Sequence, residues 1–312
     1  MSIFVEDLIA SAKLRSFAPF SQSTFDTEKA LIIANEEMLL KLVKDIFSTR
    51  EDFFLTSKDV SLVGGVGSVT IPKRSIGGTF KSLWYTENGI VKHRISLGTE
   101  EDFEDYSGQT GTPEKFLLEG DEVVLLPTPA TTTGAVRFRY YAKPNLLVST
   151  EDCARITGVT SAGGTTTLDV NTDLSGDLSV GSRVDFLSAV SPFLLWADDV
   201  TITAISSTQI EVATADIDNA AGTVEPQVGD YICPTGYANI PMLPYEFHPV
   251  LAQMMAVRML AGLGDLNKWN AAKLELKEVR EEGMGLIKNR VETEPRRIKP
   301  GRNGLVSTFS KR

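Results

Sequence analysis

The sequence predicts an α+β protein with a helical core, made of a long N-terminal helix and a C-terminal antiparallel helical hairpin. A β-hairpin or meander region and an inserted small all-β barrel or sandwich domain complete the predicted fold. Two patterns favour it: apolar residues recur at a helical period near both ends of the chain, and short strand-like segments fill the middle. The length of 312 residues, 42% of them hydrophobic, suits about two domains.

Two helices are expected near the N-terminus. The segment 4–17 has apolar residues at a helical spacing and stops before Pro19. A longer helix follows Asp26, a residue type that caps helix N-termini, and its apolar stripe runs from Ala30 to Ile46. This second segment is the long helix of the predicted core.

A β meander is expected between residues 53 and 141, where β-branched and aromatic residues alternate with turn residues. The expected strands are 53–55, 68–71, 79–85, 91–95, 122–126 and 135–141. Asn88-Gly89 is typical of a hairpin turn. The glycines of 64–67 lack the Lys-Ser/Thr ending of a phosphate loop, so we interpret them as a turn.

Residues 151–238 differ from their surroundings, because they contain thirteen acidic residues, two arginines and no lysine. Short Thr/Val/Ile segments separated by Gly/Ser/Asp turns are typical of a small barrel or sandwich. The six expected strands are 154–159, 165–170, 183–187, 200–205, 209–212 and 230–233. We therefore predict that this stretch is an inserted all-β domain.

Helical periodicity returns after residue 244. Pro249 suits the first turn of a helix that ends at Gly264, and a second helix follows at once with Lys and Glu alternating along its exposed side. The short link predicts an antiparallel hairpin. The predicted domains are a helical core with the β meander over 1–150 and 239–288, the insert over 151–238, and an extended basic C-terminal arm over 289–312.

The net charge of −10 is unevenly distributed. Residues 288–312 hold eight Lys/Arg and two Glu, so this end carries +6 and residues 1–287 carry −16. An acidic body is a poor non-specific binder of nucleic acid, because each phosphate contact needs a Lys or Arg. The basic arm has three interpretations: it binds nucleic acid, it is a disordered solubilising end, or it orders on a partner protein. We favour the last, because its charges are mixed with Leu305, Val306 and Phe309.

Membrane insertion and secretion are not expected. The sequence has no run of 18 uncharged apolar residues, and Glu6 and Asp7 lie where a secretory signal has its basic region. We therefore expect a protein that is intracellular and soluble when made, with no membrane partner.

No catalytic constellation, cofactor site or metal site is expected, and we predict that the protein is not an enzyme. The two histidines, His93 and His248, are interpreted as packing or capping residues. The stretch from Asp169 to Val180 lacks the glycine and glutamate of a calcium loop. The acidic run 100–105 is interpreted as a solvated face in preference to a cation site. Cys153 and Cys233 lie near the two ends of the insert, where a shared neck would bring them together, but we favour buried free thiols.

Several segments form a pattern through their order along the chain. They are Ala34-Asn35-Glu36, Ser48 to Phe54, Ile71 to Gly78 with a following β-hairpin, Ile240 to Pro249, a helix ending at Gly264-Asp265, a second helix, and Pro295 to Ile298. This order resembles the head-to-tail adaptor (connector, or head completion) proteins of tailed bacteriophages. The resemblance covers about 25–85 and 239–300, and the stretch 151–238 departs from it because simpler adaptors are mainly a helical core.

The resemblance implies a structural protein of the virion at the head–tail junction, present in the host cytoplasm during assembly. Such proteins form a ring, usually of twelve copies, between portal and tail, which extends the DNA channel and provides the docking surface for the tail. The implied partners are the portal protein, a nozzle or tail-tube protein of the tail, further copies of the chain, and double-stranded DNA that passes through the lumen without specific binding. The insert is expected to contact a collar, fibre or tail protein, or to serve as a spacer.

Site residues follow from the same resemblance, since adaptors of this type often grip the portal with the C-terminal segment. The implied portal-binding arm consists of Arg296, Arg297, Lys299, Arg302, Phe309 and Arg312. The helical hairpin is expected to serve lateral packing in the ring core through Leu251, Met255, Met259, Trp269, Leu276 and Val279.

Two other classes of function stay open. A carbohydrate- or receptor-binding protein of a virion or cell surface would account for the β module, although not for the terminal helices. A hydrolase with an accessory β domain would need catalytic residues that the sequence does not offer.

Overall fold

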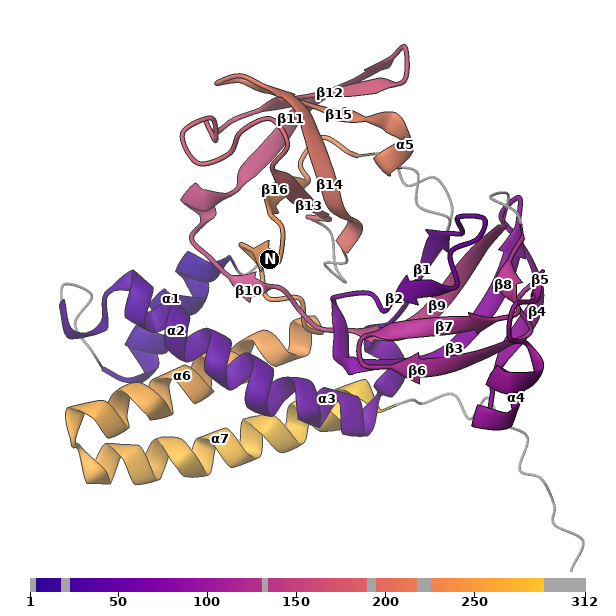
Figure 1. Cartoon of the computed structure of the whole chain (residues 1–312). Coiled ribbons are helices and arrows are strands. Elements are labelled where there is room, and N and C mark those ends of the chain that lie inside the picture. Colours follow the sequence, from indigo (N-terminus) through magenta and orange to yellow (C-terminus); the bar gives the residue numbers. More distant parts are fainter. Residues whose placement is uncertain (1–3, 18–22, 131–133, 190–194, 218–225, 289–312) are drawn as a thin grey trace, which may run out of the picture.

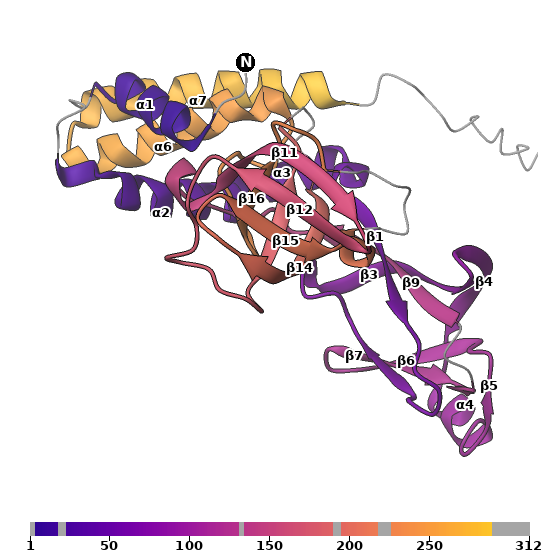
Figure 2. The ribbon, with the colours of Figure 1, turned by 90° about the horizontal axis from the view of Figure 1, so that it is seen from above.

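A computed structural model of the chain describes residues 4–17, 23–130, 134–189, 195–217 and 226–288. These residues form a layer of helices, a seven-stranded sheet and a closed barrel (Figure 1). Seen from above, the helices lie in one layer, and the sheet extends away from that layer past the barrel (Figure 2).

The helical layer combines segments from both ends of the chain. Its helices are α1 (Val5–Arg15), α2 (Thr27–Glu37), α3 (Val43–Thr49), α6 (His248–Leu263) and α7 (Leu266–Ile287). A π-helical turn, Met38–Leu42, joins α2 to α3, so helical backbone continues from Thr27 to Thr49. As expected, the Asp26 side chain caps α2 by accepting a hydrogen bond from the Lys29 amide at 2.9 Å.

The C-terminal hairpin forms where the sequence predicts it. Pro249 lies in the first turn of α6, and Gly264 ends that helix in a left-handed conformation with φ 74°, which glycine adopts without a steric penalty. Asp265 then caps α7 by accepting a hydrogen bond from the Lys268 amide. The two helices run side by side in Figure 1, and α7 lies on the outside.

The seven-stranded sheet has the strand order β1-β9-β3-β4-β6-β7-β2. Its strands are β1 (Leu55–Ser61), β2 (Ser68–Thr70), β3 (Ser75–Glu87), β4 (Ile90–Leu97), β6 (Lys115–Glu119), β7 (Glu122–Leu126) and β9 (Gly134–Ala142). Neighbouring strands are antiparallel except β4 and β6, which are parallel and connected through α4 (Glu100–Asp105). Two short parallel pairs accompany the sheet: β5 (Thr110–Gly111) with β8 (Thr128–Pro129), and β10 (Leu146–Leu147) with β17 (Tyr237–Ala238).

The barrel closes in the order β11-β12-β15-β14-β13-β16. Its strands are β11 (Ala154–Ala162), β12 (Thr165–Val170), β13 (Arg183–Leu187), β14 (Leu195–Ile205), β15 (Gln209–Ala213) and β16 (Tyr231–Pro234), with one helical turn, α5 (Thr214–Ile217), beside them. All six expected strands of the insert are confirmed. Alternation of buried apolar and outward polar residues, as in Thr165–Val170, explains why this region forms strands.

The predicted fold class is wrong, because the molecule has no single helical core. Strands hold 37% and helices 36% of the described residues. The sheet buries its own cluster around Leu83, Val136 and Phe138, and the barrel buries another around Phe186 and Ile202. Neither cluster includes a residue of α1, α2, α3, α6 or α7, because the strands turn their apolar faces toward one another; the barrel cluster gains only Ile217 from the short helix α5.

Two local predictions are also corrected. Residues 53 and 54 belong to the 3-10 turn Glu51–Phe54, and the strand begins only at Leu55. Cys153 and Cys233 form a disulfide, so the favoured interpretation as free thiols is wrong. The chain enters and leaves the barrel through adjacent segments, and this brings the two sulfurs together.

Candidate functional site

The two histidines have structural positions. His93 on β4 places Nε2 2.8 Å from the Pro113 carbonyl oxygen. His248 is fully buried at the start of α6, with Nε2 3.1 Å from the Pro241 carbonyl oxygen. Burial lowers the pKa of His248 to about 4, so the ring is neutral at physiological pH.

The described residues offer no group of three His, Cys, Asp or Glu side chains that would hold a metal ion. The acidic run 100–105 forms the exposed helix α4. Asp102 in this helix stabilises the local structure, because it takes part in a capping box with Thr99 and forms an ion pair with Lys115. Within the same described part of the chain, no helix is long and apolar enough to cross a bilayer.

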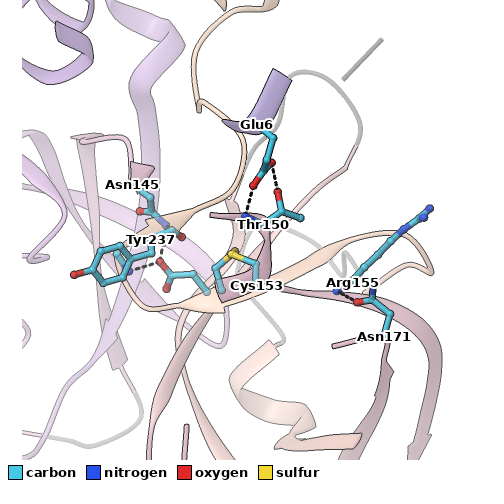
Figure 3. The surroundings of a disulfide bond; sticks show 10 residues. Glu6, Asn145, Thr150, Cys153, Arg155, Asn171 and Tyr237 are labelled. Carbon is cyan, nitrogen blue, oxygen red and sulfur yellow. Dashed lines mark hydrogen bonds between the residues drawn. A yellow bond between two sulfur atoms is a disulfide. The ribbon is translucent and has the colours of Figure 1, made fainter. Parts of the chain in front are cut away.

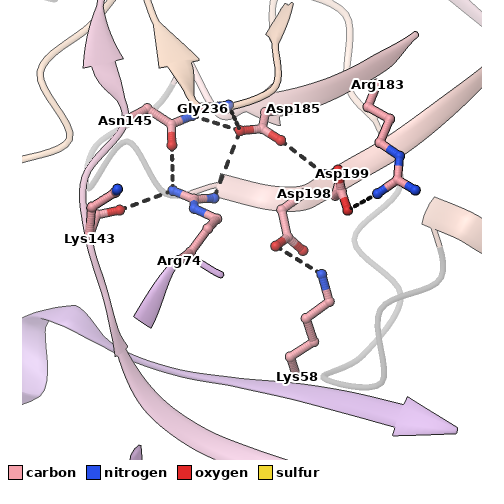
Figure 4. Close-up of polar contacts among 9 residues, drawn as sticks. All are labelled: Lys58, Arg74, Lys143, Asn145, Arg183, Asp185, Asp198, Asp199 and Gly236. Atoms are coloured by element: carbon pink, nitrogen blue, oxygen red, sulfur yellow. Dashed lines mark hydrogen bonds and ion pairs between the residues drawn. The ribbon is translucent and has the colours of Figure 1, made fainter. Parts of the chain in front are cut away.

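The most developed polar site lies where the barrel, the sheet and the linker before β10 meet. Its centre is the Asp185 carboxylate on β13, which is 0% exposed (Figure 4). The carboxylate accepts hydrogen bonds from the Asn145 side chain at 2.8 Å and from the amides of Gly236 and Asp199 at 2.9 Å each. These donors satisfy the carboxylate, because a buried polar group without hydrogen-bond partners is costly.

Arg74, from the loop before β3, connects the sheet to this centre. Its guanidinium donates to the Asn145 side chain at 2.6 Å and to the Lys143 carbonyl at 3.3 Å, and it lies 4.0 Å from the Asp185 carboxylate (Figure 4). A second bridge joins Lys58 on β1 to Asp198 on β14 at 3.1 Å. The barrel is therefore attached to the sheet by charge-assisted contacts at two points.

The neck of the barrel, residues 149–153 just before β11, is attached to the helical layer. Glu6 on α1 accepts hydrogen bonds from the Thr150 amide at 2.7 Å and the Thr150 hydroxyl at 2.6 Å, beside the Cys153–Cys233 disulfide (Figure 3). Burial, the largest single influence, raises the pKa of Glu6, but the hydrogen bonds from Thr150, from Ser149 and from the Glu6 backbone together outweigh burial and lower the pKa. Glu6 thus remains ionised and holds the neck.

Asn35 on α2 fixes the linker in the same way. Its side-chain amide donates to the Leu147 carbonyl at 3.1 Å, and its side-chain oxygen accepts from the Leu147 amide at 2.6 Å. Asn35 and Arg74 belong to two segments of the ordered pattern in the sequence. Asn35 joins the helical layer to the linker, and Arg74 joins the sheet to the linker and the barrel.

The residues expected to pack the ring core lie at different depths. Leu251, Met255 and Met259 on α6 are fully buried inside the subunit's own helical cluster. Leu276 and Val279 on α7 are partly buried against that cluster, and Trp269 is partly exposed with the Lys273 ammonium 4.9 Å from its ring. The α6 members are thus occupied within one subunit, while the α7 members lie closer to the surface.

The six residues of the expected portal-binding arm lie outside the described residues. Just before the arm, α7 carries a groove of about 930 Å³. Its described lining includes Leu274, Leu276, Met284, Lys273, Lys277 and Arg280. The sequence pattern predicts a packing role for α7 and does not indicate this mixture of apolar and basic side chains.

Comparison with known proteins gives one family match. Residues 37–161 match the family described as SU10 adaptor protein. The matched range covers less than half of the chain, but it contains the whole seven-stranded sheet, Arg74, Asn145 and the linker to the barrel. The match indicates that this part of the chain is similar to phage adaptor-type proteins. No curated protein matches the chain.

Proposed function

We propose that this protein is a head-to-tail adaptor, copies of which form a dodecameric ring between portal and tail. The observation that carries the proposal is the family match over 37–161, which falls on the sheet and on the residues that tie it to the barrel. A subunit whose helical layer, sheet and barrel are joined by polar contacts is suited to transmit load between two larger structures.

The charge distribution supports a role at the DNA channel. Residues 1–287 carry −16, and a wall of that sign repels phosphates, so DNA slides past without adhering. In this proposal the ring extends the channel, and DNA is a passing cargo with no specific site.

The C-terminal arm is proposed to grip the portal. Its basic and apolar residues suit an acidic, grooved protein surface, and the ordering cost is offset because a ring repeats the contact many times. Removal of residues 289–312 is expected to abolish loading onto portal rings. A variant with Arg296, Arg297 and Lys299 changed to Gln separates the effect of charge from that of length.

The barrel is proposed to contact a collar, fibre or tail protein. It has its own core, and its strands close on themselves, so it can project from the ring without relying on its neighbours. The same independence favours a second candidate, in which the barrel binds a carbohydrate or a receptor. Binding of the full-length protein to a glycan array, lost when the barrel is deleted between residues 150 and 238, would support that candidate.

The adaptor proposal is tested by mass photometry of the purified protein, alone and with portal rings from the same source. We expect each portal ring to gain about twelve subunits of 34.0 kDa. A portal peak that does not shift would contradict the proposal.

A further inference from the structure

The groove on α7 has one side that contacts its own subunit and one side that is open. Leu276 and Met284 pack partly against the helical cluster and Arg280 pairs with Asp45, whereas the side that carries Leu274, Lys273 and Lys277 is exposed. Of the 22 residues of α7, only Ala272, Gly283 and Ile287 are buried, and Leu274 is 68% exposed at the groove described above. A helix that leaves apolar residues on its outer side is typical of a surface that another chain covers.

The charge of this groove restricts the choice of partner. Arg280 is already paired with Asp45 on α3, so the accessible positive charge comes mainly from Lys273, Lys277 and Lys288. Glu281 is the one acidic residue among the described lining and lies 4.0 Å from Lys277. The best occupant therefore combines negative charge with an apolar anchor.

Two obvious occupants do not meet this requirement. The chain's own segment 289–312 holds seven Lys/Arg and two Glu, so the groove repels it. Duplex DNA supplies negative charge, but its phosphates leave the exposed Leu274 uncovered.

The helix α4 meets the requirement. Five of its six residues are acidic, and the sixth, Phe103, is 47% exposed. Only Asp102 among these acids has an ion-pair partner in the described part of the chain. Leu97 and Leu118, on the strands that α4 connects, are exposed as well. An acidic helix centred on an exposed phenylalanine complements a basic, apolar groove.

The two surfaces belong to different ends of the molecule. In both views α4 lies at the outer end of the sheet, far from α7 in the helical layer (Figures 1 and 2). A contact between them therefore joins separate copies head to tail, which is the type of interface that repeats around a closed ring.

We propose that α4 of one copy occupies the α7 groove of the next copy. This inference rests on the proposed ring. The lengths are compatible, because a six-residue helix spans about 9 Å and the lining from Lys273 to Met284 extends about 16 Å along α7. In this contact Phe103 lies against Leu274, and the α4 carboxylates approach Lys273 and Lys277.

Charge reversal tests the contact in the full-length protein. One variant combines Lys273→Glu with Lys277→Glu on α7, and the other combines Glu101→Lys with Glu104→Lys on α4. These four side chains are exposed, and none of them is part of the polar contacts described above that join the helical layer, the sheet and the barrel. Lys44→Glu with Lys92→Glu is the control, because it changes the net charge as much as the α7 variant at other exposed sites.

We expect each reversed variant to load onto portal rings at least tenfold more weakly than the unmodified protein, and the control to load normally. An equal mixture of the two variants restores complete rings, because each altered surface then meets a complementary one on the alternate copy. Normal loading of either variant alone, or no recovery in the mixture of folded variants, would overturn the proposal. Normal assembly of the α7 variant with loss of duplex DNA retention would overturn it in favour of a nucleic-acid surface.

A second measurement separates this proposal from the ring itself. If the unmodified protein does not load onto portals, the proposed function fails. The contact between α4 and α7 is then tested by disulfide crosslinking of Phe103→Cys mixed with Leu274→Cys at high protein concentration. The control is Leu274→Cys mixed with Ser61→Cys, because Ser61 lies outside the proposed contact. A covalent dimer that forms with Phe103→Cys and not with the control supports the contact. Equal amounts of dimer in the two mixtures, or none in either, would overturn it.

Discussion

The barrel and the helical layer differ in how completely they bury their apolar side chains. The barrel has no free strand edge, and residues such as Ile156 and Phe186 are fully buried within it. The helical layer leaves Leu266, Leu274 and Leu286 on α7 exposed at 70%, 68% and 57%. The barrel therefore has a complete core in one subunit, whereas the helical layer leaves apolar side chains available for the contact between copies that we propose.

The largest expected effect breaks the barrel. Phe186→Ala removes a fully buried aromatic side chain and leaves a cavity, so we expect the free energy of unfolding to fall by about 3–5 kcal/mol. Urea titration followed by circular dichroism measures this change. A loss below about 1 kcal/mol would mean that the barrel core is loosely packed.

The disulfide provides the next test of barrel completeness. Cys153 and Cys233 are 80 residues apart in sequence, so the bond restricts a long loop in the unfolded chain. Changing both to Ser is expected to lower the free energy of unfolding by about 2–4 kcal/mol. Thermal unfolding of the double variant beside the oxidised parent checks this, and equal midpoints would show that the closed strands suffice without the bond.

The pH dependence of the free energy of unfolding tests the packing around His248 at the start of α6. Burial lowers the pKa of His248 to about 4 from 6.5. The unfolded chain thus takes up this proton at a higher pH than the folded chain, and stability present above about pH 6.5 is lost as the pH falls toward 4. Between pH 7.5 and pH 5 we expect a loss of about 2 kcal/mol.

The control for this pH effect is His248→Gln, which has no titrating group at the position. Urea titrations at both pH values compare the two proteins. The same loss in the variant would place the pH dependence in other groups and contradict the role of His248.

The smallest expected effect on folding comes from the exposed side of α7 that carries Leu274, which we call the open face. Leu274→Ala is expected to change the free energy of unfolding by less than about 0.5 kcal/mol, because the side chain is largely exposed in the subunit. The same variant should load less well onto portal rings. A large loss of stability in the isolated subunit would contradict the open face, and the contrast with Phe186→Ala is the sharpest form of the comparison.

Local features of the fold could be predicted because they depend on nearby residues. The Asp26 cap, the Gly264 helix end and the six barrel strands each follow from short patterns. The helical core was wrongly predicted because periodicity shows which face of an element is apolar, but not which element covers it. The sheet covers its own face with Leu83 and Phe138, and sequence spacing does not reveal that pairing.

The connections between the helical layer, the sheet and the barrel could not be predicted for the same reason. Asn35 bonds Leu147 across 112 residues, and Arg74 reaches Asn145 across 71. The parallel pairing of β4 with β6 also depends on the placement of a short helix between them. The buried Asp185 gave no signal, because an isolated aspartate in a strand looks like any surface residue until its donors are in place.

The central claim is that α7 and α4 gain a partner on assembly, while the barrel core is already complete. Hydrogen exchange of the free protein and of portal-loaded protein tests it directly. We predict added protection of backbone amides in 266–287 and 100–105, with unchanged exchange in the barrel core around residues 184–187. Unchanged exchange in α7 together with new protection in the barrel core would contradict the claim.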